Sequence, residues 1–345
     1  MRTGRKVLSV SILLALVLGG SSVFATGAKE GTRGSTVELK KVVFRLDWLP
    51  SAYHAPVFVA LDKGYWKDRG LEVEVQFGKG STDTAKMVAT EQAQFGWANT
   101  VVTTHAIESG MPLKTVYGTY QRNALGIMVL EGSGIKSAAD MKGKKITMTG
   151  AGEEAVLFPL WLKMNGVEES TVERVLIESR ETRRALFLEG KVDAFWETLF
   201  SNVPILQKQT DKKIIGIMIS EGPNPLNLLL QGLITNMKTI EQEPKLVKEF
   251  VAGFKKGFQY SIKDPEDAMT ILMKMVPEIQ DREVSLGILK NSFNLLHTNS
   301  STKLPLGVYT DKDWDATLDL MVKMGNLKEI KSHSTYYTNE FVPAD

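Results

Sequence analysis

The sequence predicts an α/β protein of two lobes, each built on a parallel-rich sheet. Three observations support this fold class. Strand-like and helix-like segments alternate from residue 42 to residue 217, a pattern typical of parallel sheets covered by helices. After Asn236 the pattern changes to helices alone, and these must pack on a sheet that is already formed. Residues 89–100 and 188–198 also share one order of elements: a helix end, a polar turn and a short strand that closes on tryptophan.

The alternation begins with an apolar strand at residues 42–46. Residues 71–77 alternate apolar with acidic or amide side chains, which predicts a half-buried strand. The remaining strand-like segments are short apolar runs at 94–98, 113–120, 127–130, 145–148, 174–177, 192–195 and 214–217. The helix-like segments between the strands are 56–62, 82–90, 101–109, 155–164 and 182–188.

Four segments after Asn236 carry apolar residues at helical spacing. They are residues 245–260, 265–275, 282–296 and 312–324. Because they have no sheet of their own, we expect them to complete the first lobe. The predicted first lobe is therefore discontinuous, with residues 38–123 and 231–345. The second lobe is predicted at 124–230, and the chain is expected to cross twice, near 120–126 and 226–235.

The N-terminus predicts a cleaved export signal over residues 1–25. A basic start is followed by an apolar run at 7–18 and by a cleavage site after Ala25. That run is shorter than the roughly 20 apolar residues that span a bilayer. Residues 26–37 are polar and Gly-rich and are expected to form a disordered tether. The mature protein is expected in the periplasm.

Composition narrows the possible chemistry. The chain has 345 residues and no cysteine, which excludes a thiol nucleophile, a cysteine-ligated metal, a disulfide and the lipid-anchored cysteine of a lipoprotein. The formal net charge is +2, and loss of the three basic residues of the export signal would leave −1. No Lys/Arg block suggests nucleic-acid binding. No metal and no cofactor are expected, and the protein is expected to be a monomer.

Residues 46–66, LDWLPSAYHAPVFVALDKGYW, predict a small-molecule contact surface. Aromatic and polar side chains, Trp48, Tyr53 and His54, stand on a proline-stiffened turn between a strand and a helix. Two structural alternatives remain open. Trp48 could cap the sheet, and His54 could be a structural hydrogen-bonding residue.

The two similar stretches place Trp97 and Trp196 near the carboxyl ends of strands that would be equivalent in the two lobes. Two such rings facing each other would clamp a planar ligand, with Trp48 as a third ring. The alternative is that all helix–strand–helix connections look alike. Asn99 and Glu197 follow the two strands and are expected to add polar contacts. Tyr120 ends another strand, where it could contact the ligand or belong to the hinge.

Carboxylates at strand ends favour a ligand that carries amines. Glu153 stands at a helix start after Gly150-Ala151-Gly152, where an acid also simply complements the helix dipole. Together with Glu197 it would repel an anion and accept hydrogen bonds from ring N–H groups and amines. No lysine with Ser/Thr follows the glycines in P-loop register, so a nucleotide site is not expected.

The chain resembles the substrate-binding proteins of ABC importers, in the NMT1/THI5-like branch related to the yeast thiamine-pyrimidine synthase. Leu46, Asp47, Trp48, Pro50 and His54 match a Leu-Asp-Trp-x-Pro-x-x-x-His motif of this family. Further matches are Gly64-Tyr65-Trp66, Gly70 to Val73, residues 133–136 with 140–144, and residues 190–194. These later segments are shared with receptors for taurine, sulfonates and nitrate.

The resemblance implies a type II periplasmic-binding-protein fold, two lobes joined by a two-segment hinge. It also implies a non-enzymatic receptor that delivers a thiamine-pyrimidine-like aromatic nitrogen heterocycle to an inner-membrane ABC permease. Two alternatives stay open: a receptor for riboflavin or for an anion (sulfonate, taurine or nitrate), and an enzyme like the pyrimidine synthase. The synthases consume the histidine at the position of His54, but they carry a cysteine cluster that this chain lacks. Ser51 and residues 55–58 also depart from typical pyrimidine receptors.

Overall fold

A computed structural model describes residues 38–150 and 152–344, without the side chains of residues 152 and 153. The predicted export signal and tether, residues 1–25 and 26–37, lie outside the described residues. Among the described residues, no helix combines the length and the apolar character needed to cross a membrane. Both sheets described below belong to one unit, Glu38–Asp345.

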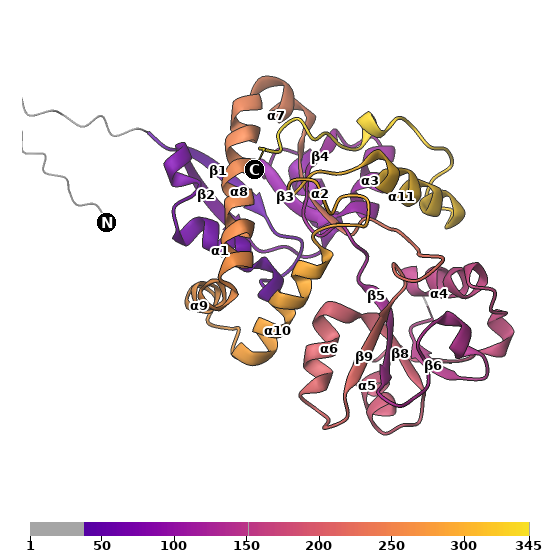
Figure 1. The fold of residues 1–345 in the computed structure, drawn as a ribbon. Coiled ribbons are helices and arrows are strands. Elements are labelled where there is room, and N and C mark those ends of the chain that lie inside the picture. Colours follow the sequence, from indigo (N-terminus) through magenta and orange to yellow (C-terminus); the bar gives the residue numbers. More distant parts are fainter. Residues whose placement is uncertain (1–37, 151, 345) are drawn as a thin grey trace, which may run out of the picture. The chain divides into compact units, whose positions relative to one another are not determined.

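The first sheet has five strands in the order β2-β1-β3-β10-β4 (Figure 1). The strands are β1 (Lys40–Arg45), β2 (Leu71–Gln76), β3 (Phe95–Asn99), β4 (Leu113–Gly118) and β10 (Gln231–Asn236). β1 pairs in parallel with β2 and β3, whereas β10 lies antiparallel between β3 and β4. The sheet is therefore closed at its centre by a strand from the last third of the chain.

The second sheet repeats this scheme in the order β7-β6-β8-β5-β9. Its strands are β5 (Leu125–Leu130), β6 (Lys145–Met148), β7 (Glu173–Leu176), β8 (Ala194–Thr198) and β9 (Ile214–Met218). Here β5, the first strand after the chain leaves β4, is the antiparallel one. Each sheet is thus parallel except for the strand that arrives from the other sheet. The predicted fold class of two parallel-rich sheets is confirmed.

The helices carry the bounds α1 (Ala55–Asp62), α2 (Ser81–Ala89), α3 (Thr100–Glu108), α4 (Gly152–Met164), α5 (Arg180–Leu188), α6 (Leu199–Gln207), α7 (Met237–Gln242), α8 (Pro244–Lys263), α9 (Pro265–Met275), α10 (Arg282–Ser292) and α11 (Asp311–Lys323). Two of them, α6 and α7, were not predicted, and Pro204 lies inside α6. The predicted late helices match α8 to α11 within a few residues. Pro244 and Pro265 occupy the first turns of α8 and α9, where proline is tolerated.

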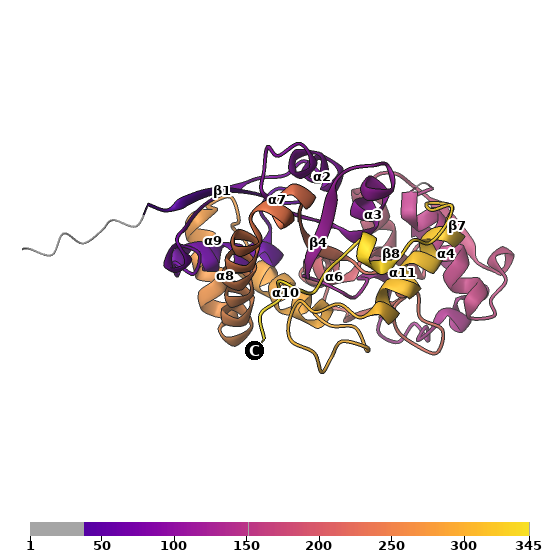
Figure 2. The ribbon, with the colours of Figure 1, turned by 90° about the horizontal axis from the view of Figure 1, so that it is seen from above.

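Helix α8 holds α1, and with it the turn that precedes α1, against the first sheet (Figures 1 and 2). Gly257 lets the two helices approach closely, because a Cβ there would lie 2.1 Å from the carbonyl oxygen of Pro56. Trp66 is buried, and its Nε1 donates to the Phe250 carbonyl at 2.9 Å. Trp66 is therefore a packing residue.

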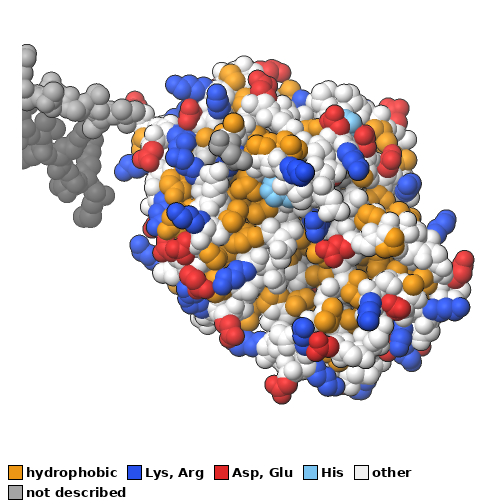
Figure 3. All heavy atoms as spheres, in the orientation of Figure 1, with side chains coloured by type: hydrophobic (Ala, Val, Ile, Leu, Met, Phe, Trp, Pro, Cys, Tyr) orange, Lys and Arg blue, Asp and Glu red, His pale blue; other side chains and the backbone are white. Residues whose placement is uncertain are grey.

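The chain crosses between the two sheets twice, once between β4 and β5 and once between β9 and β10. The expected crossing near residues 120–126 overlaps the first connection, whereas residues 231–235 of the expected second crossing, 226–235, lie within β10. The exact lobe boundaries, at residues 123/124 and 230/231, stay a prediction. Lys, Arg, Asp and Glu side chains are interspersed over the face drawn in Figure 3, so that face carries no large area of one charge among the described residues.

Candidate functional site

The carboxyl ends of β1, β3, β6 and β8 mark the candidate site. β3 and β8 are both third in their sheets, so the two similar sequence stretches lie on equivalent strands. In open α/β sheets, ligands bind outside the carboxyl ends of the parallel strands. The residues that follow these strands are therefore the candidates for ligand contact.

Asp47 follows β1 and organises a network of hydrogen bonds. His54 Nε2 lies 2.7 Å from Asp47 Oδ1, and Gln231 Nε2 donates to Asp47 Oδ2 at 2.7 Å. The backbone N–H of Ser51 donates to His54 Nδ1 at 3.0 Å. Because Nδ1 accepts, Nε2 must carry the ring proton and donate it to Asp47. The His54 ring is fully buried, so it holds the turn and does not reach solvent.

Tyr53 lies beside this pair with its hydroxyl 3.3 Å from Asp47 Oδ2. Its ring meets the ring of Phe200 edge-on, with centroids 5.7 Å apart. Burial, with the charge of Asp47 as the next cause, raises the pKa of the Tyr53 hydroxyl well above its ordinary value. Tyr53 therefore stays a neutral donor over the whole physiological range.

Tyr120 is fully buried, and its hydroxyl donates to the Tyr53 carbonyl at 2.7 Å. Burial raises the pKa of the Tyr120 hydroxyl. The backbone of Tyr120 also pairs with the start of β10, because Gln231 N–H donates to its carbonyl at 2.9 Å. The sequence left two roles open for Tyr120, ligand contact and the hinge, and these contacts favour the hinge.

A pocket of about 180 Å³ opens between residues from both sheets. It is lined by Asn99, Val101, Asn123, Ala124, Leu125, Thr198, Leu228, Leu229 and Leu230. None of these described lining residues is charged. Asn99 lies at the end of β3, and Thr198 lies at the equivalent end of β8. The pocket thus stands at the strand ends where a ligand is expected.

The polar lining residues are Asn99, Asn123 and Thr198. Asn99 Oδ1 accepts from Val102 N–H at 3.1 Å and caps α3, and Asn123 Oδ1 accepts from Leu125 N–H at 2.7 Å. Each amide oxygen accepts one backbone hydrogen bond, and the amide nitrogen of each residue supplies two further donors. The hydroxyl of Thr198 does not cap α6 in the described structure.

Trp97 and Trp196 do not face each other, which corrects the predicted ring clamp. Both rings are fully buried, Trp97 among the residues of the first core and Trp196 among those of the second. Trp196 meets Phe158 edge-on at 5.4 Å. Each tryptophan is the middle residue of its strand, so its side chain packs against helices and does not reach the strand end.

Glu197 lies at the expected strand end but is held by arginines of α5. Arg180 Nε lies 2.8 Å from Glu197 Oε2, and Thr198 N–H donates to Oε1 at 3.0 Å. Glu197 is 3% exposed, so it is not a free acceptor for a ligand amine, contrary to the sequence interpretation. The other acid of that interpretation, Glu153, lies in the first turn of α4, and its side chain is outside the described residues.

Trp48 is the exposed member of the predicted set, at 54%. It follows β1 directly after Asp47. Its carbonyl accepts from Gly78 N–H at 3.1 Å, which brings the loop after β2 to its side. Trp48 therefore does not cap the sheet, and its ring remains available at the strand ends.

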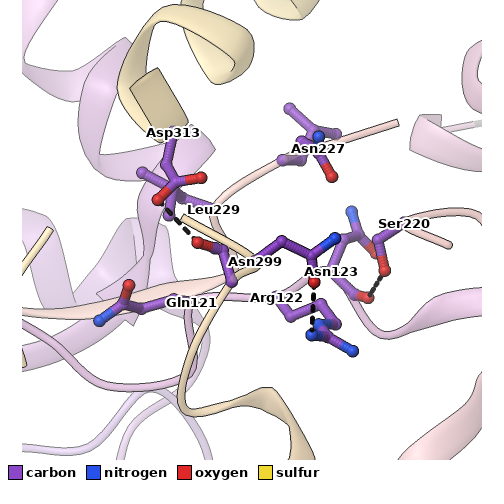
Figure 4. Close-up of a pocket in the computed structure, with 10 residues that line it drawn as sticks. Gln121, Arg122, Asn123, Ser220, Asn227, Leu229, Asn299 and Asp313 are labelled. Atoms are coloured by element: carbon purple, nitrogen blue, oxygen red, sulfur yellow. Dashed lines mark hydrogen bonds between the residues drawn. The ribbon is translucent and has the colours of Figure 1, made fainter. Parts of the chain in front are cut away.

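A polar cluster occupies the two crossing segments (Figure 4). Arg122 donates from Nη1 to Glu221 at 3.2 Å and from Nη2 to Asn299 at 3.3 Å. Ser220 donates to the Asn123 carbonyl at 2.8 Å. The space between these groups is about 10 Å³, which is room for a single water molecule. This cluster is a connection between the crossing segments rather than a ligand site.

Several residues of the site were not predicted from the sequence. Phe200, Gln231, Asn123, Thr198 and residues 228–230 reach it from elements far apart in the chain. For Thr198 a signal existed, because it stands two residues after Trp196, as Asn99 stands two residues after Trp97. Gln231 and residues 228–230 carry no local motif, and the return of the chain into β10 brings Gln231 to Asp47 and residues 228–230 to the pocket.

Known proteins resemble this chain over most of its length. The riboflavin-binding protein RibY of Chloroflexus aurantiacus is 25% identical over 350 residues, 98% of this chain and 98% of RibY. The 4-amino-5-hydroxymethyl-2-methylpyrimidine phosphate synthase THI13 of Saccharomyces cerevisiae is 25% identical over 250 residues, 70% of this chain and 73% of the synthase. A riboflavin-binding protein and a synthase are thus similar to this chain at the same level of identity.

Among solved structures, the periplasmic aliphatic sulphonate binding protein SsuA of Escherichia coli superposes with a TM-score of 0.64. The superposed region covers 84% of this chain and 94% of SsuA, at 14% identity. The likeness therefore shows the fold, which is that of a periplasmic binding protein. The family profile described as NMT1/THI5 like matches residues 51–268. The match begins within the turn of Tyr53 and His54 and covers the strands from β2 to β10. The chain therefore belongs to the NMT1/THI5-like family.

Proposed function

We propose that this protein is a periplasmic receptor of an ABC importer that binds an uncharged aromatic nitrogen heterocycle and delivers it to an inner-membrane permease. The observation that carries the proposal is the 180 Å³ pocket at the strand ends, whose described lining combines apolar side chains with two amides and a hydroxyl. Such a lining fits a flat ring with polar atoms on its edge. The similarity to RibY supports a vitamin-like heterocycle as the class.

An anionic ligand is the weaker alternative. A sulfonate or nitrate would be expected to meet a cationic side chain, and none of the described lining residues is charged. Arg122, the chain neighbour of the lining residue Asn123, is engaged by Glu221 and Asn299, and Arg180 is paired with Glu197. The helix starts at Asn99 and Thr198 could attract an anion, but the Asn99 side chain already caps α3.

A synthase-like enzyme is the second candidate, because THI13 is similar over 70% of this chain. The state of His54 argues against it. The ring is fully buried, and both of its nitrogens are engaged, by Asp47 and by Ser51. A histidine consumed as a reagent would have to be reached by its co-reactants.

Ligand release and calorimetry test the proposed function. The protein is purified from its own source or from a periplasmic extract, denatured, and the released small molecules are identified by absorbance and mass. The emptied and refolded protein is then titrated with riboflavin, with 4-amino-5-hydroxymethyl-2-methylpyrimidine and with taurine. We expect micromolar or tighter binding of a heterocycle and none of taurine. Binding of taurine alone would overturn the proposal, and conversion of a bound pyrimidine precursor would support the enzyme.

A further inference from the structure

We infer that helices α6 and α10 form a clasp that holds the two lobes together when no ligand is bound. α6 lies between β8 and β9 of the second sheet, whereas α10 contributes to the core of the first. The inference goes beyond the proposed function, because it does not depend on which ligand the protein carries. It is carried by the contacts along the facing sides of the two helices.

The two helices lie side by side (Figures 1 and 2). Lys208 follows the end of α6, and its Nζ lies 2.5 Å from Oδ2 of Asp281, which caps the start of α10. Further along, Pro204 of α6 faces Gly287 of α10, because a Cβ added at Gly287 would lie 3.3 Å from Pro204 Cβ. The end of α6 therefore meets the start of α10, so the helices run in opposite directions.

Pro204 and Gly287 are costly residues for the interior of a helix. Proline lacks the N–H group that the helix uses, and glycine is the next least favourable residue there. Neither residue ends its helix, since α6 continues to Gln207 and α10 to Ser292. Opposite each other, however, a residue without a side chain lets the proline ring come close. The pair thus favours close packing of the two helices over the stability of each helix alone.

α6 has two apolar faces, and the second sheet uses only one of them. That face packs in the core of the second sheet through Leu199, Val203 and Leu206. Phe200 and Ile205 instead pack against the core of the first lobe. Residues 200, 204 and 208 are spaced by four and therefore share one side of the helix. This second face is the part of the clasp that α6 supplies.

The clasp reaches the candidate site from both helices. The ring of Phe200, at the start of α6, meets the ring of Tyr53 edge-on. At the end of α10, the Ser292 hydroxyl donates to the Tyr120 hydroxyl at 3.2 Å. The Tyr120 hydroxyl in turn donates to the Tyr53 carbonyl. Separation of the two helices should therefore also disturb the turn that carries Tyr53.

Apolar contacts contribute more to the clasp than its ion pair does. The side chains of Lys208 and Asp281 are 51% and 44% exposed, so solvent screens their attraction. Phe200 and Ile205 stabilise the contact by removing apolar surface from water. All of these contacts are made by the chain's own side chains, so no ligand is needed to form them. We therefore expect the lobes to stay together in the unliganded protein.

Distances between spin labels on the two lobes test the clasp. Because the chain has no cysteine, the double variant Lys86→Cys, Lys142→Cys accepts one label on α2 and one between β5 and β6. Pulsed electron paramagnetic resonance of the unliganded protein should give one narrow distance distribution. Adding Gly287→Leu should broaden this distribution and shift it to longer distances, because the new side chain must push Pro204 away.

A second variant loosens the clasp without inserting a side chain. Ile205→Ala removes an apolar contact with the first lobe, and we expect it to broaden the distribution as well. Its matched control is Val203→Ala, which truncates the face of α6 that packs in its own lobe and should leave the distribution unchanged. The control for Gly287→Leu is Lys290→Leu, because Lys290 points to α9, where it pairs with Glu266. Circular dichroism verifies that each variant folds.

The outcomes separate this inference from the proposed function. A broad distribution in the unliganded parent would overturn the clasp. So would a narrow distribution that both Gly287→Leu and Ile205→Ala leave unchanged, or an equal broadening by Val203→Ala. These results would leave the receptor role intact, because that role is tested by ligand release and calorimetry. Broadening by the two clasp variants alone would support the clasp, whichever ligand the protein binds.

Discussion

His54 donates its Nε2 proton to Asp47 while its Nδ1 accepts the backbone N–H of Ser51, so a single buried ring joins both ends of the turn after β1. The same Asp47 accepts from Gln231 at the start of β10. The turn that carries Tyr53 is thereby fixed to the centre of the first sheet. The histidine of the family motif acts here as a positioning residue.

Replacement of His54 by alanine should therefore destabilise the protein. A buried hydrogen bond to a carboxylate contributes about 1.5–3 kcal/mol, and the truncation also leaves a cavity, so we expect the free energy of unfolding to fall by about 3 kcal/mol. Urea denaturation followed by circular dichroism measures the change. His333→Ala is the control, since His333 makes an exposed pair with Asp315 and should change stability by less than about 1 kcal/mol. Equal effects of the two variants would contradict the role given to His54.

Glu197→Gln should lower stability, because its partners are arginines and not a ligand. Arg183 is buried and lies 3.6 Å from Glu197 Oε2, so the neutral variant leaves a buried cation without its counter-charge. Arg180 is half exposed, and solvent screens its share of the pair. We expect a loss of about 2 kcal/mol in the free energy of unfolding. The exposed pair of Glu189 with Lys191 supplies the control Glu189→Gln, which should stay within about 0.5 kcal/mol of wild type. A stable Glu197→Gln that loses ligand affinity would restore the original interpretation of this acid.

Gly257→Ala should disturb the packing of α1 against α8. Alanine normally favours a helix over glycine, but the new Cβ would meet the backbone oxygen of Pro56, which cannot move independently of α1. We expect a loss of about 2–3 kcal/mol from overpacking. The exposed neighbour Gln259 on the same helix gives the control Gln259→Ala, which should be neutral. A Gly257→Ala variant as stable as wild type would show that α1 can shift without cost.

Stability should fall at high pH because Tyr53 is buried in its neutral form. Its pKa in the folded protein is raised, so the unfolded chain loses this proton first. The contribution of Tyr53 is complete below the pKa of about 10 in the unfolded state and is lost as the pH rises from there towards the folded pKa. In that range the free energy of unfolding should fall by about 1.4 kcal/mol per pH unit for this group. Tyr53→Phe should show a shallower fall between pH 9 and 11, measured by urea denaturation at each pH. An identical slope would mean that the hydroxyl is not held neutral by the fold.

The fold could be predicted from the sequence because strands and helices each show a characteristic spacing of apolar residues. Residues 71–77 alternate and residues 265–275 repeat at helical spacing, and both segments appear as expected. β10 was not predicted as a strand. Its residues carry no signal that distinguishes a crossing segment from a central strand, since their neighbours β3 and β4 are more than 100 residues away in the chain.

The site was predicted less well, for a physical reason. The sequence shows that the tryptophans lie near strand ends. Successive side chains on a strand point to opposite faces, so a shift of one residue moves a side chain from the core to the binding crevice. Trp97 and Trp196 fall on the core side, whereas Trp48 stands past the last residue of its strand and is exposed. Glu197 was expected to be free because Arg180 and Arg183 reach it from a different element. Pairing of this kind depends on the packing of α5 beside β8.

The place of β10 between β3 and β4 also sets the order in which the protein can be assembled. All five strands of the second sheet lie between residues 125 and 218, so they can pair as soon as that stretch has left the ribosome. The first sheet stays open at its centre until residue 236 has been synthesised, and its cover waits for α8. During synthesis β3 and β4 must therefore wait for β10, the strand that pairs with both, while the second sheet forms. Nascent chains that stop near residue 225 should contain a folded second sheet beside an incomplete first one.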